Sequence, residues 1–282
     1  MTDRLRELWD FDDLDATEKR FRAQLELEPT SEGRAEVLTQ LARVEGLRGA
    51  FEAGERLVVD AAGLGAESAV VAVRVDLERG RLLRSAGDRE AALPLFESAF
   101  AKAVDAGEWF LAADAAHMAA LAAGSREGFV AWTTRGIALA DEQEAASYWL
   151  GPLLNNLGWE HNDAGEHELA LDAFERALVA RERDPANRAA VELARYAVGK
   201  ALRALGRSEE AIPLLEHAVS SAESEGRPDG WLHEELAEEY AAVGRPADAR
   251  AQAALALPLL LGNDPSLVED GERRRRLEAL AG

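Results

Sequence analysis

The sequence predicts an all-α fold, an α-solenoid superhelix in which antiparallel helix pairs stack one after another. The first observation is composition: 48% of the 282 residues are apolar, but only 6% are aromatic. Ala and Leu dominate the apolar fraction, and both are strong helix formers. The second observation is a glycine that recurs at intervals of 37 to 41 residues. No sustained alternation of β-branched and polar residues predicts a strand.

The recurring glycine belongs to a longer pattern of small residues. The six turn glycines are Gly49, Gly87, Gly124, Gly165, Gly206 and Gly244. A small residue usually stands seven positions before the glycine, another five after it and a third seven further on, as in Gly158, Ala170 and Ala177 around Gly165. Glycine permits the turn, and small residues let two helices approach closely, so each unit predicts a helix–turn–helix pair. One pair cannot bury its own apolar face, so the pairs must stack.

The unit around Gly124 departs from this pattern. His117 and Phe129 occupy positions that hold small residues in the other units. The register of this repeat is therefore not fixed by the sequence.

The segment LLNNLGWEHNDAGEHELALDAFERAL (residues 153–178) resembles the tetratricopeptide repeat. It follows the pattern of that family at Leu157, Gly158, Gly165, Ala170, Phe174 and Ala177. The resemblance extends over residues 35–262 and implies about six helix pairs. The repeat intervals exceed the basic length of the family and are similar to its longer-helix branch, which includes kinesin light chains and bacterial peptide-sensing regulators.

The two ends of the chain are expected to cap the stack, because a solenoid needs polar-faced ends to stay soluble. Residues 1–34 are expected to form a capping half-repeat, with Phe21 and Leu25 on one face. Residues 263–282 are expected to form a capping helix that covers the last open seam with its leucines.

Charge and cysteine content exclude several classes of function. The chain has 53 acidic and 32 basic residues and a net charge of -21. Such a surface repels phosphate, so binding to nucleic acid or to an anionic membrane is disfavoured. There is no cysteine, which excludes disulfides, cysteine zinc sites and thiol nucleophiles. Without an apolar leader or a stretch of about 18 apolar residues, the protein is expected to be soluble and cytoplasmic.

His161 and His167, which lie among carboxylates, are the most obvious candidates for a metal site. They do not have the spacing of an H-E-x-x-H helix, and the turn at Gly165 separates them. The alternative is that His161 packs in a position usually aromatic in the resembled family, while His167 is exposed. Residues 61–68 lack the third glycine of a dinucleotide loop and the Gly-Lys-Ser/Thr of a P-loop, and no nucleophile elbow is present. We therefore expect no metal, no cofactor and no enzymatic activity.

In the resembled family the first helix of each pair lines a concave face, where ligands bind. The residue that follows the small residue of the first helix should point toward this face. Residues three or four positions away on the same helix lie on the same side, and together they form an inward-facing stripe. The resulting candidate ligand-binding residues are Arg43, Arg74, Arg81, Arg84, Asn155, Asn156, Trp159, Asn162, Tyr196, Lys200 and Arg203.

These residue types suit the recognition of an extended peptide. Arginine binds carboxylate through two hydrogen bonds, asparagine offers a donor and an acceptor to a main chain, and tryptophan offers an apolar anchor. The expected partner is a protein or peptide segment, acidic or C-terminal, bound by a monomer or weak oligomer. Two alternatives stay open: the arginines could belong to ordinary helix-surface ion pairs, such as Arg74 with Glu78, and the protein could be an assembly protein that oligomerises through its convex face or ends.

Overall fold

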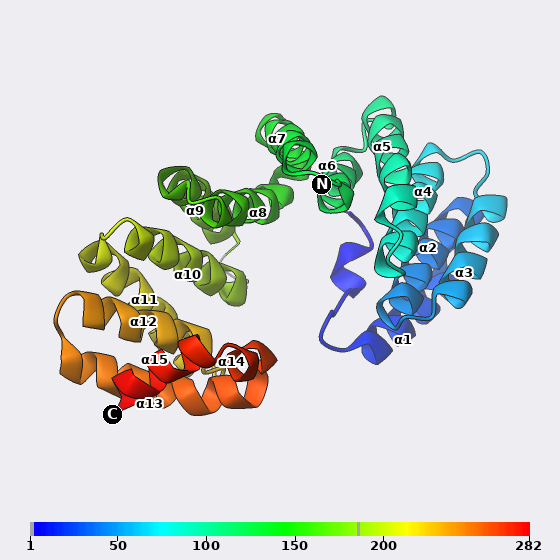
Figure 1. Ribbon diagram of the computed structural model, residues 1–282. Helices are drawn as coiled ribbons and strands as arrows, with labels where there is room; N and C mark the ends of the chain where they lie inside the picture. The colour runs from blue at the N-terminus through cyan, green and yellow to red at the C-terminus, as the bar shows by residue number, and fades with distance from the viewer. Residues whose placement is uncertain (1–2, 185–186) are drawn as a thin grey trace. The chain divides into compact units, whose positions relative to one another are not determined.

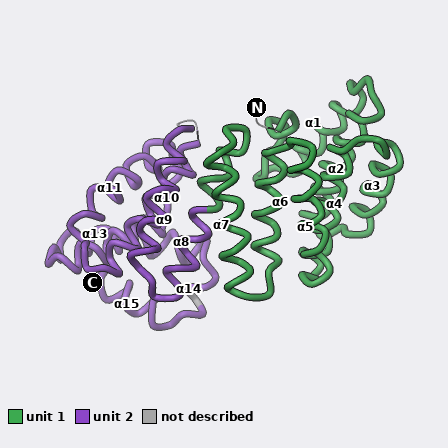
Figure 2. The backbone as a smooth tube through the Cα atoms, turned by 90° about the horizontal axis from the view of Figure 1, so that it is seen from above, with its two compact units in different colours: residues 1–153 green, residues 154–282 purple. Residues whose placement is uncertain are grey.

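The computed structural model describes residues 3–184 and 187–282. Within these residues the secondary structure consists of fifteen α-helices and two short 3₁₀ helices, with no strand (Figure 1). The predicted all-α fold class is therefore confirmed. The chain divides into two compact units, residues 1–153 (unit 1) and residues 154–282 (unit 2) (Figure 2).

Each unit is built from successive helices joined by short turns. The helices of unit 1 are η1 (Arg6–Leu8), α1 (Leu14–Leu27), α2 (Ser31–Leu47), α3 (Phe51–Leu64), α4 (Ala69–Ser85), α5 (Arg89–Ala106), α6 (Trp109–Ala122), α7 (Arg126–Glu142) and η2 (Glu144–Trp149). The boundary between the units falls within α8 (Leu150–Asp163). Unit 2 continues with α9 (His167–Glu182), α10 (Arg188–Ala204), α11 (Ser208–Ser224), α12 (Gly230–Ala242), α13 (Pro246–Asn263), α14 (Pro265–Glu269) and α15 (Gly271–Ala281).

All six turn glycines lie between the two helices of a pair. Five of them adopt a positive φ, a conformation that favours glycine; they are Gly49, Gly87, Gly165, Gly206 and Gly244. The N–H of the residue after the glycine then donates to a carbonyl of the last helical turn. For example, the N–H of Glu166 donates to the carbonyl of His161 at 2.9 Å. This six-to-one bond is the Schellman motif, and it explains why glycine recurs at this position.

Gly124 also lies between two helices, α6 and α7, but its turn is built differently. It is not among the glycines with positive φ. Instead, the Ser125 hydroxyl accepts a hydrogen bond from the N–H of Gly128 at 3.1 Å and caps the start of α7. The end of α6 is closed without a left-handed residue, by the N–H of Ala123, which donates to the carbonyl of Ala119 at 2.9 Å.

The small residue on the first helix of a pair accommodates a large side chain from the second helix. A Cβ atom added to Gly158 would lie 2.4 Å from the ring of Phe174, and one added to Gly80 would lie 2.6 Å from the ring of Phe96. Both phenylalanines are completely buried. The spacing of small residues in the sequence thus reflects side chains that interlock between paired helices.

Helices at both ends of the described chain cover apolar side chains of their neighbours. Phe21 of α1 is buried against Val37 and Leu41 of α2. At the other end, Leu277 of α15 is buried in a cluster with Leu260 of α13. The expected boundaries of the caps, at residues 34 and 263, stay predictions.

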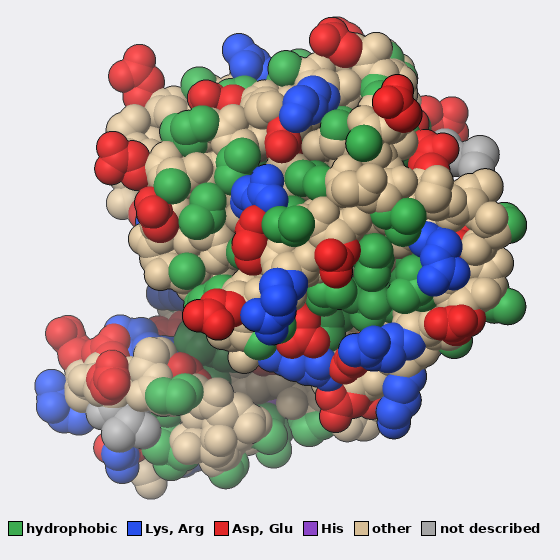
Figure 3. Space-filling model, turned by 90° about the vertical axis from the view of Figure 1, so that its right-hand side faces the viewer, with side chains coloured by type: hydrophobic (Ala, Val, Ile, Leu, Met, Phe, Trp, Pro, Cys, Tyr) green, Lys and Arg blue, Asp and Glu red, His purple; other side chains and the backbone are tan. Residues whose placement is uncertain are grey.

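Charged side chains of both signs are spread over the surface. Figure 3 shows acidic and basic side chains interspersed with hydrophobic ones on the face in view. None of the helices in the described parts of the chain is long and apolar enough to span a membrane.

Candidate functional site

Unit 2 contains a pocket of about 510 Å³ on the surface formed by the first helices of its pairs, which we call the first-helix surface. Helices α8, α10 and α12 contribute to it, so three successive pairs take part. The lining residues are Trp159, Ala189, Glu192, Leu193, Tyr196, Lys200, Arg227, Asp229, Trp231 and Leu232. Most of these side chains are apolar or aromatic, the usual composition of a ligand pocket.

Two aromatic side chains form one wall of this pocket. The ring of Trp159 meets Phe174 edge to face, with the centroids 5.0 Å apart, and lies 6.3 Å from the ring of Tyr196. Because Phe174 is fixed in the core between α8 and α9, it holds Trp159 in place. Burial raises the pKa of Tyr196 and keeps its phenol neutral.

The rim of the pocket carries exposed apolar side chains. Leu193 on α10 is 51% exposed and Trp231 on α12 is 40% exposed. Asp229 caps the start of α12 by accepting a hydrogen bond from the N–H of Trp231, the second residue of the helix, at 2.8 Å. The guanidinium of Arg273 lies over the ring of Trp231, 4.1 Å from its centroid. Large apolar groups grouped around a pocket mark a binding surface more often than scattered ones do.

The cations near the pocket have carboxylate partners. Lys200 Nζ lies 3.4 Å from Glu235 Oε2, and Arg203 Nε lies 2.5 Å from Glu235 Oε1. Burial opposes the charge of Arg203, but its hydrogen bond to Glu235 outweighs this and raises its pKa. Arg227 pairs with Glu192 at 3.1 Å. Two cations therefore share the single carboxylate of Glu235.

The candidate arginines of unit 1 take part in contacts within the protein. Arg74 is buried and binds Asp3 at 2.6 Å and Glu36 at 3.1 Å. Arg43 lies over the rings of Trp9 and Phe11, at 5.1 and 5.3 Å from their centroids.

Arg81 is held equally firmly, between Glu78 and Asp114, at 2.5 Å from each. Burial disfavours its charge, yet the two carboxylates outweigh burial and raise the pKa of Arg81. Arg84 is half-buried, with its Nε 3.4 Å from the carbonyl oxygen of Leu121. Burial lowers the pKa of Arg84, and the charge of Arg89 adds to this effect.

The structure thus brings together three of the candidate residues, Trp159, Tyr196 and Lys200, in one pocket. Arg203 joins them indirectly, through Glu235. The three asparagines, Asn155, Asn156 and Asn162, are half-buried on α8 and are not among the residues described as lining the pocket.

Sequence reasoning missed two rim residues, Leu193 and Trp231. Leu193 stands seven positions before Lys200, and Trp231 seven before Glu238. Since residues seven apart share a helix face, extending the inward stripe by two turns toward the N-terminus of each helix would have included both.

The two histidines of the 153–178 segment lie near the turn at Gly165. His161 Nδ1 lies 2.6 Å from Glu166 Oε2. His167 is half-buried, not exposed as expected, because it begins α9 beside the turn. Among the described residues, no three His, Asp or Glu side chains are arranged to hold a metal ion.

Residues 193–225 match the family model of the tetratricopeptide repeat. They cover most of α10 and α11, the pair at the centre of the pocket. This pair of helices is thus similar to a tetratricopeptide repeat. No curated protein matches the sequence of the chain.

Three solved structures share the fold of this repeat protein. The apo form of RapI has a TM-score of 0.73 at 13% identity, covering 99% of this chain and 80% of RapI. The apo form of the quorum sensor NprR from B. thuringiensis has a TM-score of 0.58 at 12% identity, covering 99% of this chain and 85% of NprR. Repeats of a putative kinesin light chain from Podosopora anserina have a TM-score of 0.53 at 18% identity, covering 67% and 94%. The resemblance to the longer-helix branch is confirmed in fold.

Proposed function

We propose that this protein is a non-catalytic scaffold that binds a protein or peptide segment on the first-helix surface of unit 2. The observation that carries the proposal is the apolar pocket of about 510 Å³, built by three successive first helices. Its exposed rim residues, Leu193 and Trp231, would be covered by a partner. Burying such side chains stabilises a complex by about 25 cal/mol for each Å² of apolar area.

The pocket suits a segment that carries one large apolar side chain, either aromatic or leucine. Trp159 and Tyr196 offer ring faces and edges to such an anchor. Asn155 and Asn162 lie one turn to either side of Trp159 on α8. Their amides would serve as donors and acceptors for the main chain of the segment.

The charge distribution next to the pocket supports an acidic residue or a C-terminal carboxylate as the second recognised group. Lys200 and Arg203 share one carboxylate, that of Glu235. The neighbouring acids Glu234 and Glu238 are engaged by arginines of α15. Lys200, Arg203 and Glu235 together carry one net positive charge, which an anionic group of the partner would balance.

The comparisons add support of a general kind. NprR, which shares this fold, is named a quorum sensor, and RapI and NprR were both solved in apo form. In the resembled family, ligands bind the concave face made by first helices, the same kind of surface that holds the pocket here.

Assembly through the ends of the chain is the competing function. The end clusters argue against it, because α1 and α15 bury apolar side chains of their neighbours. Sedimentation of the purified protein distinguishes the two functions: a concentration-independent monomer fits the scaffold, and a concentration-dependent oligomer fits assembly.

The proposal is tested by selecting peptides on the wild-type protein by display and titrating the selected peptides against two variants. Leu193→Ser changes the pocket rim, whereas Leu169→Ser changes a leucine of α9 that is equally exposed but does not line the pocket. We expect Leu193→Ser to weaken binding about tenfold, which corresponds to about 1.4 kcal/mol, and Leu169→Ser to leave it unchanged. Equal effects of the two substitutions would refute the proposed site.

A further inference from the structure

The first-helix surface of unit 1 is covered by the chain's own N-terminal segment, residues 3–11. Residues of this segment line a small cavity of about 90 Å³ together with residues of α2, α4, α6 and η2. The surface that corresponds to the binding surface of unit 2 is thus already covered in unit 1.

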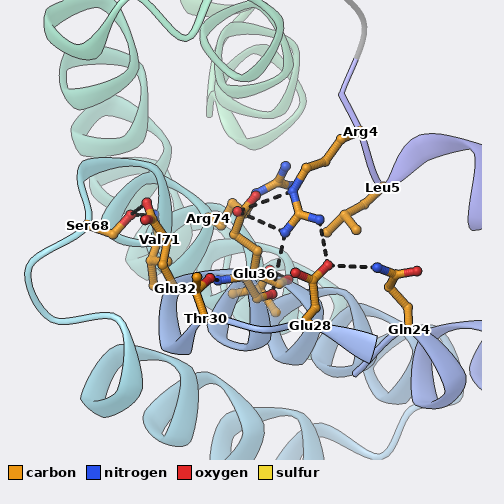
Figure 4. Close-up of polar contacts among 12 residues, drawn as sticks. Arg4, Leu5, Gln24, Glu28, Thr30, Glu32, Glu36, Ser68, Val71 and Arg74 are labelled. Atoms are coloured by element: carbon orange, nitrogen blue, oxygen red, sulfur yellow. Dashed lines mark hydrogen bonds and ion pairs between the residues drawn. The ribbon is translucent and has the colours of Figure 1, made fainter. Parts of the chain in front are cut away.

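Charged side chains fix the first part of this segment. The carboxylate of Asp3 accepts hydrogen bonds from both terminal nitrogens of Arg74, at 2.6 and 3.0 Å. Arg4 donates to Glu28 at 2.7 Å and to Glu36 at 3.0 Å, as Figure 4 shows together with Arg74. The Asp3–Arg74 pair has the two-bond geometry by which arginine recognises carboxylates of partners.

Apolar and aromatic side chains fix the rest of it. Leu5 is buried in a cluster with Phe21. Trp9 Nε1 donates a hydrogen bond to Gln40 Oε1 at 2.9 Å, and its ring stacks on Phe11 at 4.8 Å between centroids. An acid, a leucine and a tryptophan thus each occupy a separate place on the helices.

The contacts of this segment are those of a bound peptide. The hydrogen bonds between backbone groups of residues 3–9 are local, such as Arg6 N to Asp3 O and Leu8 N to Leu5 O, and the carbonyl of Leu8 also accepts a hydrogen bond from Arg20 of α1 at 3.0 Å. Its bonds to α2 and α4 run through side chains. The fit is also incomplete, since Glu78 lines the cavity and its buried Oε2 has no hydrogen-bond partner within the described residues.

We propose that residues 3–11 are a built-in, displaceable ligand and that the surface beneath them is a second binding site. The partner that fits is a protein segment with an acidic residue for Arg74, a leucine two positions later and a tryptophan four positions after that. The partner gains access when it displaces the N-terminal segment. This inference concerns unit 1 and does not depend on the pocket of unit 2.

The test uses a synthetic peptide of residues 3–11 as the probe and the full-length chain as the receptor. In the wild type the internal segment competes with the peptide, which lowers its apparent affinity by the fraction of open surface. The double variant Asp3→Ala/Trp9→Ala weakens the internal segment only. We expect it to bind the peptide at least tenfold more tightly than the wild type, and Arg74→Ala added to it to abolish this binding. Equal affinity for wild type and double variant, or binding that survives Arg74→Ala, would overturn the proposal.

A second experiment measures opening of the segment through an introduced thiol. The chain has no cysteine of its own, so only the introduced thiol reacts. Leu5→Cys places a thiol at a buried position and Glu7→Cys places one at an exposed position. We expect a thiol reagent to label position 5 at least tenfold more slowly than position 7, and the free peptide to accelerate labelling at position 5 alone. Unchanged labelling of position 5 at saturating peptide would contradict displacement. Leu193→Ser serves as a control that should not alter either readout, so failure of the unit 2 pocket and failure of this site are distinguishable.

Discussion

Trp159 and Phe174 meet edge to face, with their ring centroids 5.0 Å apart, and Phe174 lies against the bare backbone of Gly158. Phe174 therefore takes part both in the packing of α8 against α9 and in the support of the pocket wall at Trp159. The small residue that makes the repeat recognisable in the sequence also determines where the aromatic wall of the candidate site lies.

Gly158→Ala should destabilise the protein although alanine is the better helix former. The added Cβ would lie 2.4 Å from the ring of Phe174, and such overpacking costs about 1–3 kcal/mol. Gly63 also lies in a helix, but a Cβ added there would meet nothing within 4 Å apart from its chain neighbours and the backbone of its own helix, so Gly63→Ala should stabilise by up to about 1 kcal/mol. Urea unfolding of both variants measures the difference, and a destabilising Gly63→Ala together with a stabilising Gly158→Ala would contradict the interlocked packing.

Ala170→Leu tests the register of the repeat. Ala170 is completely buried among Leu171, Phe174 and Ala197, and extra methyl groups there should cost about 1–3 kcal/mol. The neighbouring Leu169 is 55% exposed, and Leu169→Ala should change stability by no more than about 0.5 kcal/mol. An unchanged denaturation midpoint for Ala170→Leu would show that the assigned register is wrong.

Arg81→Met separates a structural role from ligand binding. Its removal leaves Glu78 and Asp114 without their shared cation, and breaking such a buried ion pair costs about 3–5 kcal/mol. Arg84→Met, one helical turn away on α4, removes a half-buried arginine with a single long contact and should cost less than about 1 kcal/mol. Thermal unfolding of both variants is the measurement, and similar losses would argue against the buried network.

Glu239 should make stability depend on pH. It is 0% exposed, and a hydrogen bond with Ser208 only partly offsets the effect of burial on its carboxylate. Burial, with an added effect of the charge of Glu235, raises the pKa of Glu239 to about 7 from its usual 4.5. The protonated form is therefore favoured in the folded state, and its stabilising contribution is lost as pH rises from about 4.5 to 7.

Glu239→Gln should remove that loss, which is on the order of 3 kcal/mol. The measurement is the urea midpoint at pH 5 and at pH 8, where the variant should exceed the wild type in stability only at the higher pH. Glu168→Gln, at an exposed position of α9, is the control and should leave the pH profile unchanged. A wild type with a flat profile between these pH values would contradict the assignment.

Local sequence patterns predicted most of the fold. Turn positions such as Gly165 and Gly206 have a left-handed backbone, which favours glycine. The position of Gly158 has no room for a side chain beside the ring of Phe174. Both requirements can be recognised in the sequence as recurring glycines. The division into two units within α8 could not be predicted from the sequence, because the repeat pattern continues through it without a linker.

The candidate site was predictable only in part. Trp159 and Lys200 follow from the inward stripe, and Trp231 lies on the same stripe two turns earlier. The coverage of Arg74 by Asp3 could not be foreseen, because it joins residues far apart in the chain and no periodic pattern connects them. Ion pairs of this kind depend on tertiary packing, which charge counts do not reveal.

The central claim is that a partner segment lies along the first helices of unit 2, and a photo-crosslink tests it most directly. A display-selected peptide with one photoreactive residue is irradiated on the wild-type protein, and the attachment points are identified by mass spectrometry. We predict attachment at Trp159, Tyr196 or Trp231, on the wall and rim of the pocket. Attachment confined to the second helices α9, α11 and α13 would contradict the account.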